Sequence, residues 1–293
     1  MPTPTRRQFL HAVAATAVVA PLAARPGAQQ APSLPVPGVL GLELYSLRHR
    51  MAKDIPGALK VARGFGFTEV EGGVFQKMTA AESRKLLDDH GLRMQSTLVG
   101  YEALAKDVQK VIADARTLGA TYVGTAWIPH SQPFTREVVD KASKDFAAWG
   151  KACRDAGQRF FYHIHGYEFQ PGPDGTLMDT LLEQSPAELV DFKADVFWVT
   201  RGGGDPVQLL TKYPSRFKLL HLKDMEKGGA TGDPTGHAPD ETNVVLGTGQ
   251  LDFPAIFKAA KAAGVTHYYI EDEHPQAEAQ IPRTLEYLRN LKI

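Results

Sequence analysis

The sequence predicts a single-domain (β/α)8 barrel, the TIM barrel fold of the α/β class. Strand-like and helix-like segments alternate eight times along the chain, which is typical of a parallel sheet covered by helices. Several of the strand-like segments end in His, Asp or Glu, and parallel barrels place their chemistry at strand ends. The length of 293 residues suits one such barrel preceded by a leader. A doubly wound open sheet is the alternative, but eight repeats favour the closed barrel.

The first residues are predicted to be an export signal rather than part of the fold. A twin-arginine pattern, Thr-Arg-Arg-Gln-Phe-Leu, occupies positions 5–10, and an alanine-rich apolar run follows at 12–24. This run is too short to cross a membrane comfortably as a helix. Both features are typical of a signal for the twin-arginine translocation (Tat) pathway, with cleavage after Ala24 or Ala28.

This pattern divides the chain into a Tat signal peptide at 1–28, a linker at 29–37 and the barrel at 38–293. We therefore expect a periplasmic or secreted mature protein with no stable membrane insertion after cleavage. An uncleaved anchor or a basic amphipathic N-terminus is the alternative. Cys153 is the single cysteine, so no intramolecular disulfide is possible, and its apolar-periodic surroundings predict a buried side chain.

The expected strands are short, apolar runs with β-prone residues. They cover residues 39–45, 69–71, 93–98, 122–126, 160–165, 194–199, 217–223 and 267–271. The segments between them have helical periodicity, and in the helix expected over 105–118 the apolar residues share one face. Glycines that suit a left-handed helix C-cap precede several strands. They are Gly64 or Gly66, Gly91, Gly119, Gly157 and Gly264.

One long stretch, residues 225–250, has neither strand nor helix periodicity and follows the seventh expected strand. Structureless loops of this length in a compact domain are usually functional or disordered. Its position after a barrel strand predicts a lid over the barrel mouth. The glycines at 202–204 lack the spacing of a dinucleotide-binding motif and precede a helix start, so we interpret them as a turn.

Histidines and acids at the ends of the fifth to eighth expected strands form a candidate metal site. His163 and His165 are two residues apart, so they lie on the same side of a strand. Asp195 interrupts an apolar run, where a carboxylate is costly to bury unless it is paired or metal-bound. His221 and Glu271 occupy the next two strands. Imidazole and carboxylate together suit Mn²⁺, Zn²⁺, Co²⁺ or Mg²⁺, and we expect Mn²⁺.

Further polar and aromatic side chains belong to the same strand ends. Glu168 follows the fifth expected strand, and Lys223 shares the parity of His221 on the seventh. Acids at the first two strand ends could accept hydrogen bonds from hydroxyls, an arginine could meet a carboxylate or phosphate, and an aromatic face suits sugar C–H groups. Capping, ion pairing and core packing are the structural alternatives. These candidate substrate-binding residues are Glu43, Arg48, Glu71 and Trp198.

Together these segments resemble the sugar phosphate isomerase/epimerase family, whose members are xylose isomerase-like TIM barrels. The resemblance covers nearly all of the chain after the leader, and its motifs are specific to the superfamily rather than to a substrate. The segments that carry it are residues 41–48, 70–73, 162–169, 195–199, 221–224 and 270–273.

The resemblance implies one divalent metal at the barrel mouth, with ligands that are commonly Glu, Asp, His and Glu from strands five to eight. Asp195, His221 and Glu271 match the last three of these ligands, and His163 stands at the position of the first. His165 or Glu168 could instead supply the fifth-strand ligand. The chain departs from the family pattern at Ile164, which replaces the Asn of a His-Asn-His phrase, and at Leu98, where many relatives carry a histidine.

The resemblance also implies a reaction, a metal-dependent isomerisation or epimerisation of a sugar or keto sugar through an enediolate. Glu271 or Glu168 would remove the proton, and His165 or Lys223 would steady charge or return the proton. If a glycosidic oxygen lies β to the carbonyl, the same intermediate leads to elimination. The alternative is therefore a metal-dependent lyase that cleaves 3-keto-glycosides.

Two other classes of protein share these features. A non-catalytic periplasmic sugar-binding protein would fit the change at Leu98. A phosphoesterase resembling endonuclease IV would share the barrel, but the formal net charge of +0 and the lack of basic clusters count against nucleic acid. We expect a small carbohydrate as the partner, and a homodimer remains open.

Overall fold

The structure is a computed structural model that describes residues 35–292. The predicted Tat signal at 1–28 lies outside the described residues, as does most of the predicted linker. Within the described residues, no helix has the length and apolar character needed to cross a membrane.

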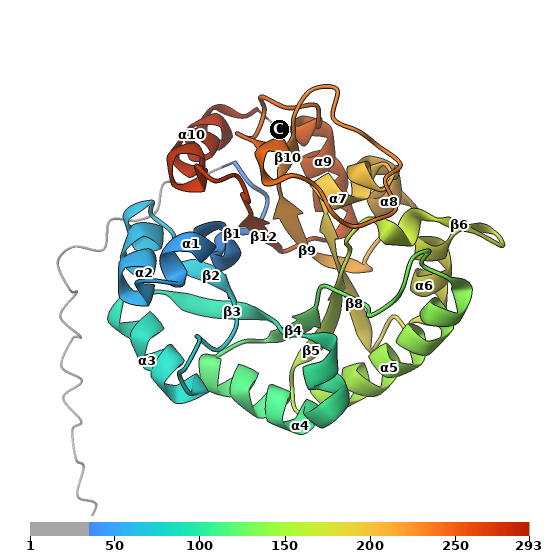
Figure 1. The fold of residues 1–293 in the computed structure, drawn as a ribbon, viewed down its shortest axis with the longest axis horizontal. Coiled ribbons are helices and arrows are strands. Elements are labelled where there is room, and N and C mark those ends of the chain that lie inside the picture. Colours follow the sequence, from blue (N-terminus) through green and yellow to red (C-terminus); the bar gives the residue numbers. More distant parts are fainter. Residues whose placement is uncertain (1–34, 293) are drawn as a thin grey trace, which may run out of the picture. The chain divides into compact units, whose positions relative to one another are not determined.

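Eight parallel strands close into a barrel, in the order β1, β12, β9, β8, β5, β4, β3 and β2, and Figure 1 shows the helices as a ring around them. This confirms the predicted (β/α)8 fold. The barrel strands are β1 Val39–Glu43, β2 Glu69–Gly72, β3 Arg93–Leu98, β4 Tyr122–Thr125, β5 Arg159–His163, β8 Val190–Asp195, β9 Phe217–Leu222 and β12 His267–Ile270.

The helices follow the strands in alternation, and their ends agree with local sequence signals. Asp54 caps α2 by accepting a hydrogen bond from the Gly57 amide at 2.9 Å. Gly119 and Gly264 adopt the predicted left-handed C-cap, with φ of 89° and 80°, whereas Gly64 lies inside α2. The α-helices are α1 Arg48–Met51, α2 Ile55–Gly64, α3 Ala80–Asp89, α4 Tyr101–Leu118, α5 Arg136–Asp155, α6 Leu177–Gln184, α7 Val196–Arg201, α8 Pro206–Lys212, α9 Phe253–Ala263 and α10 Ala277–Asn290.

The sixth strand was predicted in the wrong place. It spans Val190–Asp195, and most of the expected strand at 194–199 is helix α7. Asp195 causes the change, because its Oδ1 accepts hydrogen bonds from the amides of Phe197 at 2.9 Å and Trp198 at 3.1 Å. A short apolar run alone does not distinguish strand from buried helix. Trp198 therefore lies on a helix rather than at a strand end.

Aromatic side chains fill part of the barrel interior. Tyr122, Phe161 and Tyr269 form a buried cluster there with Leu219. Gly41 leaves room for the Tyr269 ring, which a Cβ at this position would strike. The interior is thus packed by aromatic rings, and the polar side chains at residues 43, 163, 195, 221 and 271 lie beyond this layer, at the carboxyl ends of the strands.

The stretch after β9 is more ordered than its sequence indicates. Two short strands, β10 (Asp224–Met225) and β11 (Asn243–Val244), pair antiparallel within it, and the 3-10 helix η3 (Asp240–Thr242) precedes β11. The buried Asp224 side chain holds the return of this segment, since it accepts hydrogen bonds from the amides of Gly247 at 2.9 Å and Gly249 at 3.0 Å. The prediction of an irregular stretch was therefore wrong in part.

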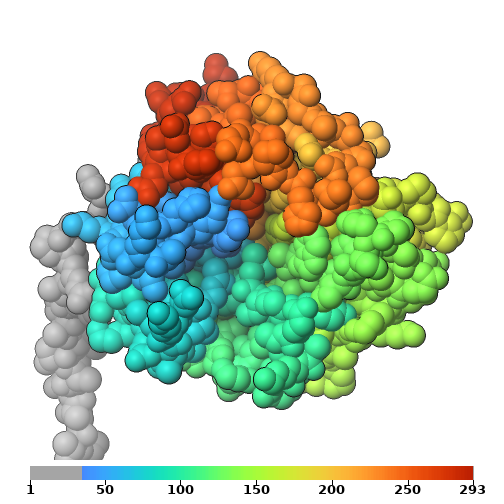
Figure 2. All heavy atoms as spheres, viewed as in Figure 1, coloured from blue at the N-terminus to red at the C-terminus, as the bar shows by residue number. Residues whose placement is uncertain are grey.

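Several contacts attach this segment to the rest of the barrel, among them two ion pairs. Arg48 pairs with Asp240 at 2.6 Å, and Arg201 pairs with Asp233 at 2.7 Å. Gly236 has φ of 69° and packs so tightly against Tyr167 that a Cβ would lie 2.8 Å from its ring. Figure 2 shows the orange segment beside the blue segment that carries Arg48.

Smaller elements complete the fold. The strands β6 (Pro171–Gly172) and β7 (Gly175–Thr176) form a hairpin before α6. Two further 3-10 helices follow β1 and β5, η1 at Leu44–Leu47 and η2 at Tyr167–Phe169. Cys153 is fully buried, as predicted.

Asp179 is expected to link stability to pH at the junction of α6 and α8. Its carboxylate accepts hydrogen bonds from Lys212 Nζ and Tyr213 Oη, both at 2.8 Å, and from the Thr176 amide. Burial alone would raise the pKa of Asp179, but these hydrogen bonds lower it to about 2. The folded pKa is thus below the unfolded value of about 3.9, so the stabilisation is present above pH 4 and is lost as pH falls towards 2.

Asp179→Ala should therefore lower the free energy of unfolding by about 1 kcal/mol at pH 7, as loss of a capping interaction does, because it breaks the capping box with the N-cap Thr176. The difference from the wild type should shrink at pH 3. Urea midpoints of both proteins at the two pH values would measure it. An equal difference at both values would contradict the assignment.

Candidate metal centre

Four side chains bring donor atoms together at the carboxyl ends of neighbouring strands. His163, Asp195, His221 and Glu271 each offer one atom, and these atoms all lie within 4.8 Å of one another. His163 Nε2 and His221 Nδ1 are 3.0 Å apart, and His221 Nδ1 is 3.1 Å from Glu271 Oε2. Asp195 Oδ2 lies 3.5 Å from His163 Nε2. These are the four residues that the sequence placed in one metal site.

Asp195 is positioned by the helix that follows it. Its Oδ1 caps α7, while its Oδ2 has no hydrogen-bond partner although the side chain is fully buried. A buried carboxylate oxygen without a partner is costly unless a cation or donor meets it. Oδ2 lies 3.5 Å from His163 Nε2 and 3.6 Å from His221 Nδ1, and a cation among the four donor atoms would satisfy this oxygen.

His221 is oriented by a carboxylate and a lysine beneath it. Its Nε2 is 2.6 Å from Glu71 Oε1 and 3.3 Å from Lys193 Nζ, and Glu71 in turn pairs with Lys193. The shorter contact to the carboxylate places an imidazole proton on Nε2, and Nδ1 faces the four-atom cluster. A carboxylate behind a histidine is the usual partner of a metal-binding imidazole.

The charged side chains around the four donor atoms favour a cation among them. Burial and Lys193 would lower the pKa of His221, but Glu271, Glu71 and Asp195 outweigh them and hold it well above its usual value. Burial opposes the charged form of Glu71, yet Lys193 and His221 keep its pKa well below the usual range. These shifts describe a site in which negative charge exceeds positive charge.

Glu43 and a second lysine complete this arrangement, which we name the mouth cluster. Burial and the Glu71 carboxylate raise the pKa of Glu43 well above its usual value. Glu71, Asp195, Glu271 and Glu273 set four acidic side chains against the ammonium groups of Lys193 and Lys223, so acidic groups outnumber the lysines beside the four donor atoms. The mouth cluster consists of Glu43, Glu71, His163, Lys193, Asp195, His221, Lys223, Glu271 and Glu273.

The donor set fits a divalent transition metal. Two imidazole nitrogens and two carboxylate oxygens suit Zn²⁺, Mn²⁺ or Co²⁺. Lys223 holds the acidic side in place, because its Nζ lies 2.9 Å from Glu273 Oε2 and 3.4 Å from Glu271 Oε2.

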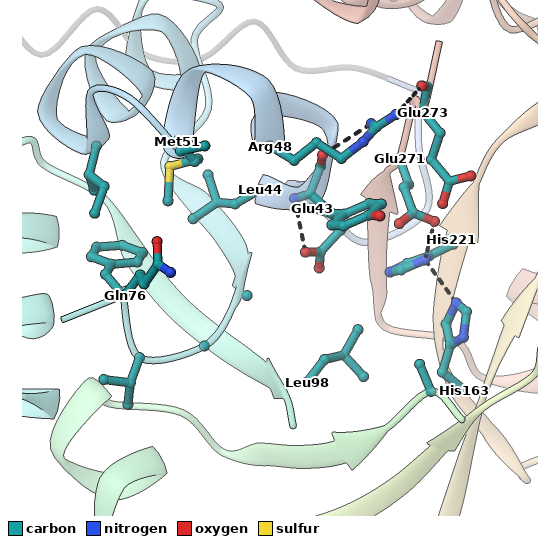
Figure 3. Close-up of a pocket in the computed structure, with 18 of the residues that line it drawn as sticks. Glu43, Leu44, Arg48, Met51, Gln76, Leu98, His163, His221, Glu271 and Glu273 are labelled. Carbon is teal, nitrogen blue, oxygen red and sulfur yellow. Dashed lines mark hydrogen bonds and ion pairs between the residues drawn. The ribbon is translucent and has the colours of Figure 1, made fainter. Parts of the chain in front are cut away.

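A cavity of about 720 Å³ opens beside the four donor atoms. His163, His221 and Glu271 line one end of it, as Figure 3 shows, while Leu44 and Met51 lie at the other end. The cavity is therefore polar where the donor atoms lie and largely apolar elsewhere.

The remaining predicted site residues lie in three different settings. His165 lines the cavity and stacks on Trp198, with ring centroids 4.6 Å apart. Arg48 also lines the cavity, but its Nη2 donates to Asp240 Oδ2 and to the Glu273 carbonyl, both at 2.6 Å. Trp198 is buried on α7 behind His165 and does not line the cavity.

Glu168 lies away from the cavity. Its Oε1 accepts hydrogen bonds from Tyr162 Oη at 2.5 Å and from the His165 amide at 2.9 Å, and its side chain is fully buried. Burial raises the pKa of Glu168 to about 7, although those hydrogen bonds act in the opposite direction. This geometry makes Glu168 a support for the loop that carries His165.

Lys193 is the residue of the mouth cluster that the sequence interpretation missed. It is fully buried, and its ammonium lies 4.5 Å from the centre of the Phe161 ring and 5.4 Å from that of Tyr269. Asp191, Lys193 and Asp195 alternate along β8, which is a signal for the inward face of a strand. The signal was hidden because the sixth strand was placed four residues too late.

The model of one protein family matches residues 59–291, and its description is xylose isomerase-like TIM barrel. The chain belongs to this family. This confirms the xylose isomerase-like TIM barrel expected from the resemblance, and the strand-end position of the four donor atoms agrees with where such barrels hold their sites.

The individual proteins that the chain resembles have low sequence identity to it. An inosose dehydratase from Lacticaseibacillus casei is 26% identical over 159 residues, which cover 52% of this chain and 51% of that protein. The chain thus spans about half the length of the curated relatives that it matches first. A crystal structure of a sugar phosphate isomerase/epimerase from Parabacteroides distasonis has a TM-score of 0.71 and 26% identity, and it covers 90% of this chain and 98% of that one.

The barrel also resembles the IolI protein, whose crystal structure contains a bound zinc atom. The TM-score is 0.67 over 85% of this chain and 96% of that one. At 14% identity this likeness shows the fold alone.

Proposed function

We propose that the chain is a divalent-metal-dependent enzyme that acts on a sugar or keto sugar through an enediolate, as an isomerase or epimerase. The observation that carries this proposal is the group of four donor atoms beside the cavity, one of them the unpartnered Asp195 Oδ2. The inosose dehydratase and isomerase/epimerase relatives support a sugar-like substrate, and the zinc in IolI supports a metal.

The proposed ligands are His163, Asp195, His221 and Glu271. Mn²⁺ is the cation that we propose first, with Zn²⁺, Co²⁺ or Mg²⁺ as alternatives. When bound, such a cation would polarise a carbonyl and lower the pKa of the neighbouring C–H group.

The chain offers an acid and a base on opposite walls of the cavity. β1 and β5 are diametrically opposed in the eight-stranded order, and Glu43 ends β1 while His165 follows β5. His165 Nδ1 and Glu43 Oε2 are both buried without a hydrogen-bond partner. A proton donor and a proton acceptor that face one substrate from two sides suit isomerisation and epimerisation.

We therefore assign proton abstraction to His165 and proton return to Glu43. Burial lowers the pKa of His165 to about 3, with His163 and Lys223 acting in the same direction, so the imidazole is neutral at pH 7 but a weak base, and its assignment rests on its unpartnered Nδ1 and its place in the cavity lining. Glu271 remains a second candidate base, because its carboxylate also lines the cavity. Glu168 would act through His165, and Lys223 would hold Glu271 in place.

A metal-dependent lyase is the second candidate, favoured by the match to inosose dehydratases. The first step is the same: His165 takes the proton next to the carbonyl. The C–O bond at the β position then breaks, the electron pair leaves with the oxygen, and Glu43 supplies the proton to that oxygen. With a 3-keto-glycoside the leaving group is the glycosidic oxygen. We further propose that the enzyme acts after Tat export, in the periplasm or outside the cell.

Exchange of solvent deuterium tests the shared proton-abstraction step. The metal-loaded enzyme should introduce deuterium next to the carbonyl of keto sugars in D₂O, as followed by NMR. His165→Gln should slow this exchange about 100-fold or more, because a positioned general base contributes on the order of 10²–10⁴ in rate. His90→Gln, a change on the outer helical ring, is the matched control. Turnover of a keto sugar without any deuterium exchange would contradict the enediolate, and full exchange by His165→Gln would move the base to Glu271.

A further inference from the structure

The cavity has an apolar half that the four donor atoms do not explain. Leu44, Met51 and Ile55 come from the segment after β1, while Phe75 follows β2 and Leu98 ends β3. Figure 3 shows Leu44 and Met51 on the far side of Glu43 from His221 and Glu271, with Leu98 below them in the view. We name these five side chains the apolar wall.

The rim of the same half is also apolar. The described residues include three large apolar side chains that are more than a third exposed, and two of them border this cavity: Tyr45 at 52% and Val74 at 38%. Exposed apolar side chains that gather at a cavity mark a binding surface more often than scattered ones do. Their position extends the apolar wall to the solvent.

The size of the cavity also indicates a ligand larger than one sugar ring. About 720 Å³ lies in the range of pockets that enclose a drug-sized ligand, roughly 300–1,000 Å³, and exceeds what one sugar ring fills. A second groove of about 440 Å³ begins at Val74 and Leu98, which line both spaces. There is room for a group as large as the sugar itself.

An unsubstituted sugar suits this wall poorly. Hydroxyl groups buried against Leu44, Met51 and Phe75 would lose their hydrogen bonds to water without gaining new ones, which is costly. Arg48, the charged side chain near this wall, already donates to Asp240 and to the Glu273 carbonyl, and the exposed Gln76 is the polar side chain at its rim. The apolar wall therefore matches a group that has no hydroxyls.

We propose that the substrate is a glycoside whose sugar faces the mouth cluster and whose apolar aglycone lies against the apolar wall. This inference rests on the proposed function, because it takes the sugar end from there. It adds that Met51, Leu98 and Phe75 determine specificity, and that an aryl or similar apolar group is part of the substrate.

Paired glucosides test the inference without turnover. Phenyl and methyl glucosides of both anomeric forms lack the carbonyl that activates the C–H bond, so their affinities for the metal-loaded enzyme can be measured by ligand-observed NMR titration. Burial of one phenyl ring should make the phenyl form bind about tenfold tighter or more. Met51→Gln should reduce this preference to about threefold or less, because it places a polar group in the wall.

Met78→Gln is the matched control, since Met78 is a partly buried methionine that packs on the same core but does not line the cavity. It should leave the preference unchanged. Equal affinities of phenyl and methyl glucosides for the wild type would overturn the aglycone inference and leave the proposed function standing. Phenol binding as tightly as phenyl glucoside would also overturn it. Failure of every sugar to bind a protein that holds metal would overturn both proposals.

Discussion

His221→Ala is expected to reduce the affinity for Mn²⁺ or Zn²⁺ more than about 100-fold, because even the loss of a partner behind a metal ligand costs about 10–100-fold. The substitution removes the Nδ1 atom at the centre of the donor set, 3.0 Å from His163 Nε2 and 3.1 Å from Glu271 Oε2. It also removes the contact through which Glu71 orients the site. Metal content after loading and desalting, measured by mass spectrometry, should fall from near one ion per chain to a small fraction.

The control is another histidine of the barrel strands. His267 begins β12, at the end of the barrel opposite to the donor atoms, and lies 3.9 Å from Glu69. His267→Ala should retain the metal. Glu271→Ala should lose it, as His221→Ala does. A wild-type protein that stays metal-free after loading would remove the proposed mechanism and favour a non-catalytic sugar-binding protein.

Most of the fold followed from local patterns, because the alternation of strand and helix signals reports the barrel directly. Seven of the eight strands lie where the sequence predicts them, within a few residues. The sixth was wrong because the capping action of Asp195 turns an apolar run into α7. Strand-end spacing could not show that an aspartate at this position accepts two backbone hydrogen bonds.

The four donor atoms could be foreseen, since carboxyl ends of parallel strands converge on one mouth. The roles of the surrounding acids could not. Gly166, with φ of 92°, turns the chain so that Glu168 accepts the His165 amide instead of lining the cavity. Likewise, Arg48 meets Asp240 from a segment 192 residues away, a contact that no local pattern encodes.

Lys193, inside the barrel, is expected to contribute strongly to the stability of the protein. Lys193→Met should destabilise the protein by about 3–5 kcal/mol, because it leaves the fully buried Glu71 carboxylate without its cation. Methionine keeps the length of the side chain, so the loss reflects charge rather than a cavity. Urea unfolding of the metal-free proteins would measure the change in the free energy of unfolding.

A double-mutant cycle separates the interaction between Lys193 and Glu71 from the individual contributions of the two side chains. Lys193→Met combined with Glu71→Gln should be more stable than Lys193→Met alone, because the amide removes the uncompensated charge. Lys151 provides the matched control: it pairs with Asp155 at 2.5 Å on the surface, and Lys151→Met should cost less than about 0.5 kcal/mol. If Lys193→Met cost no more than this, or if the two core substitutions were additive, Lys193 would not be the counter-charge that keeps Glu71 ionised beneath His221. The orientation of the imidazole would then have to depend on Glu71 alone.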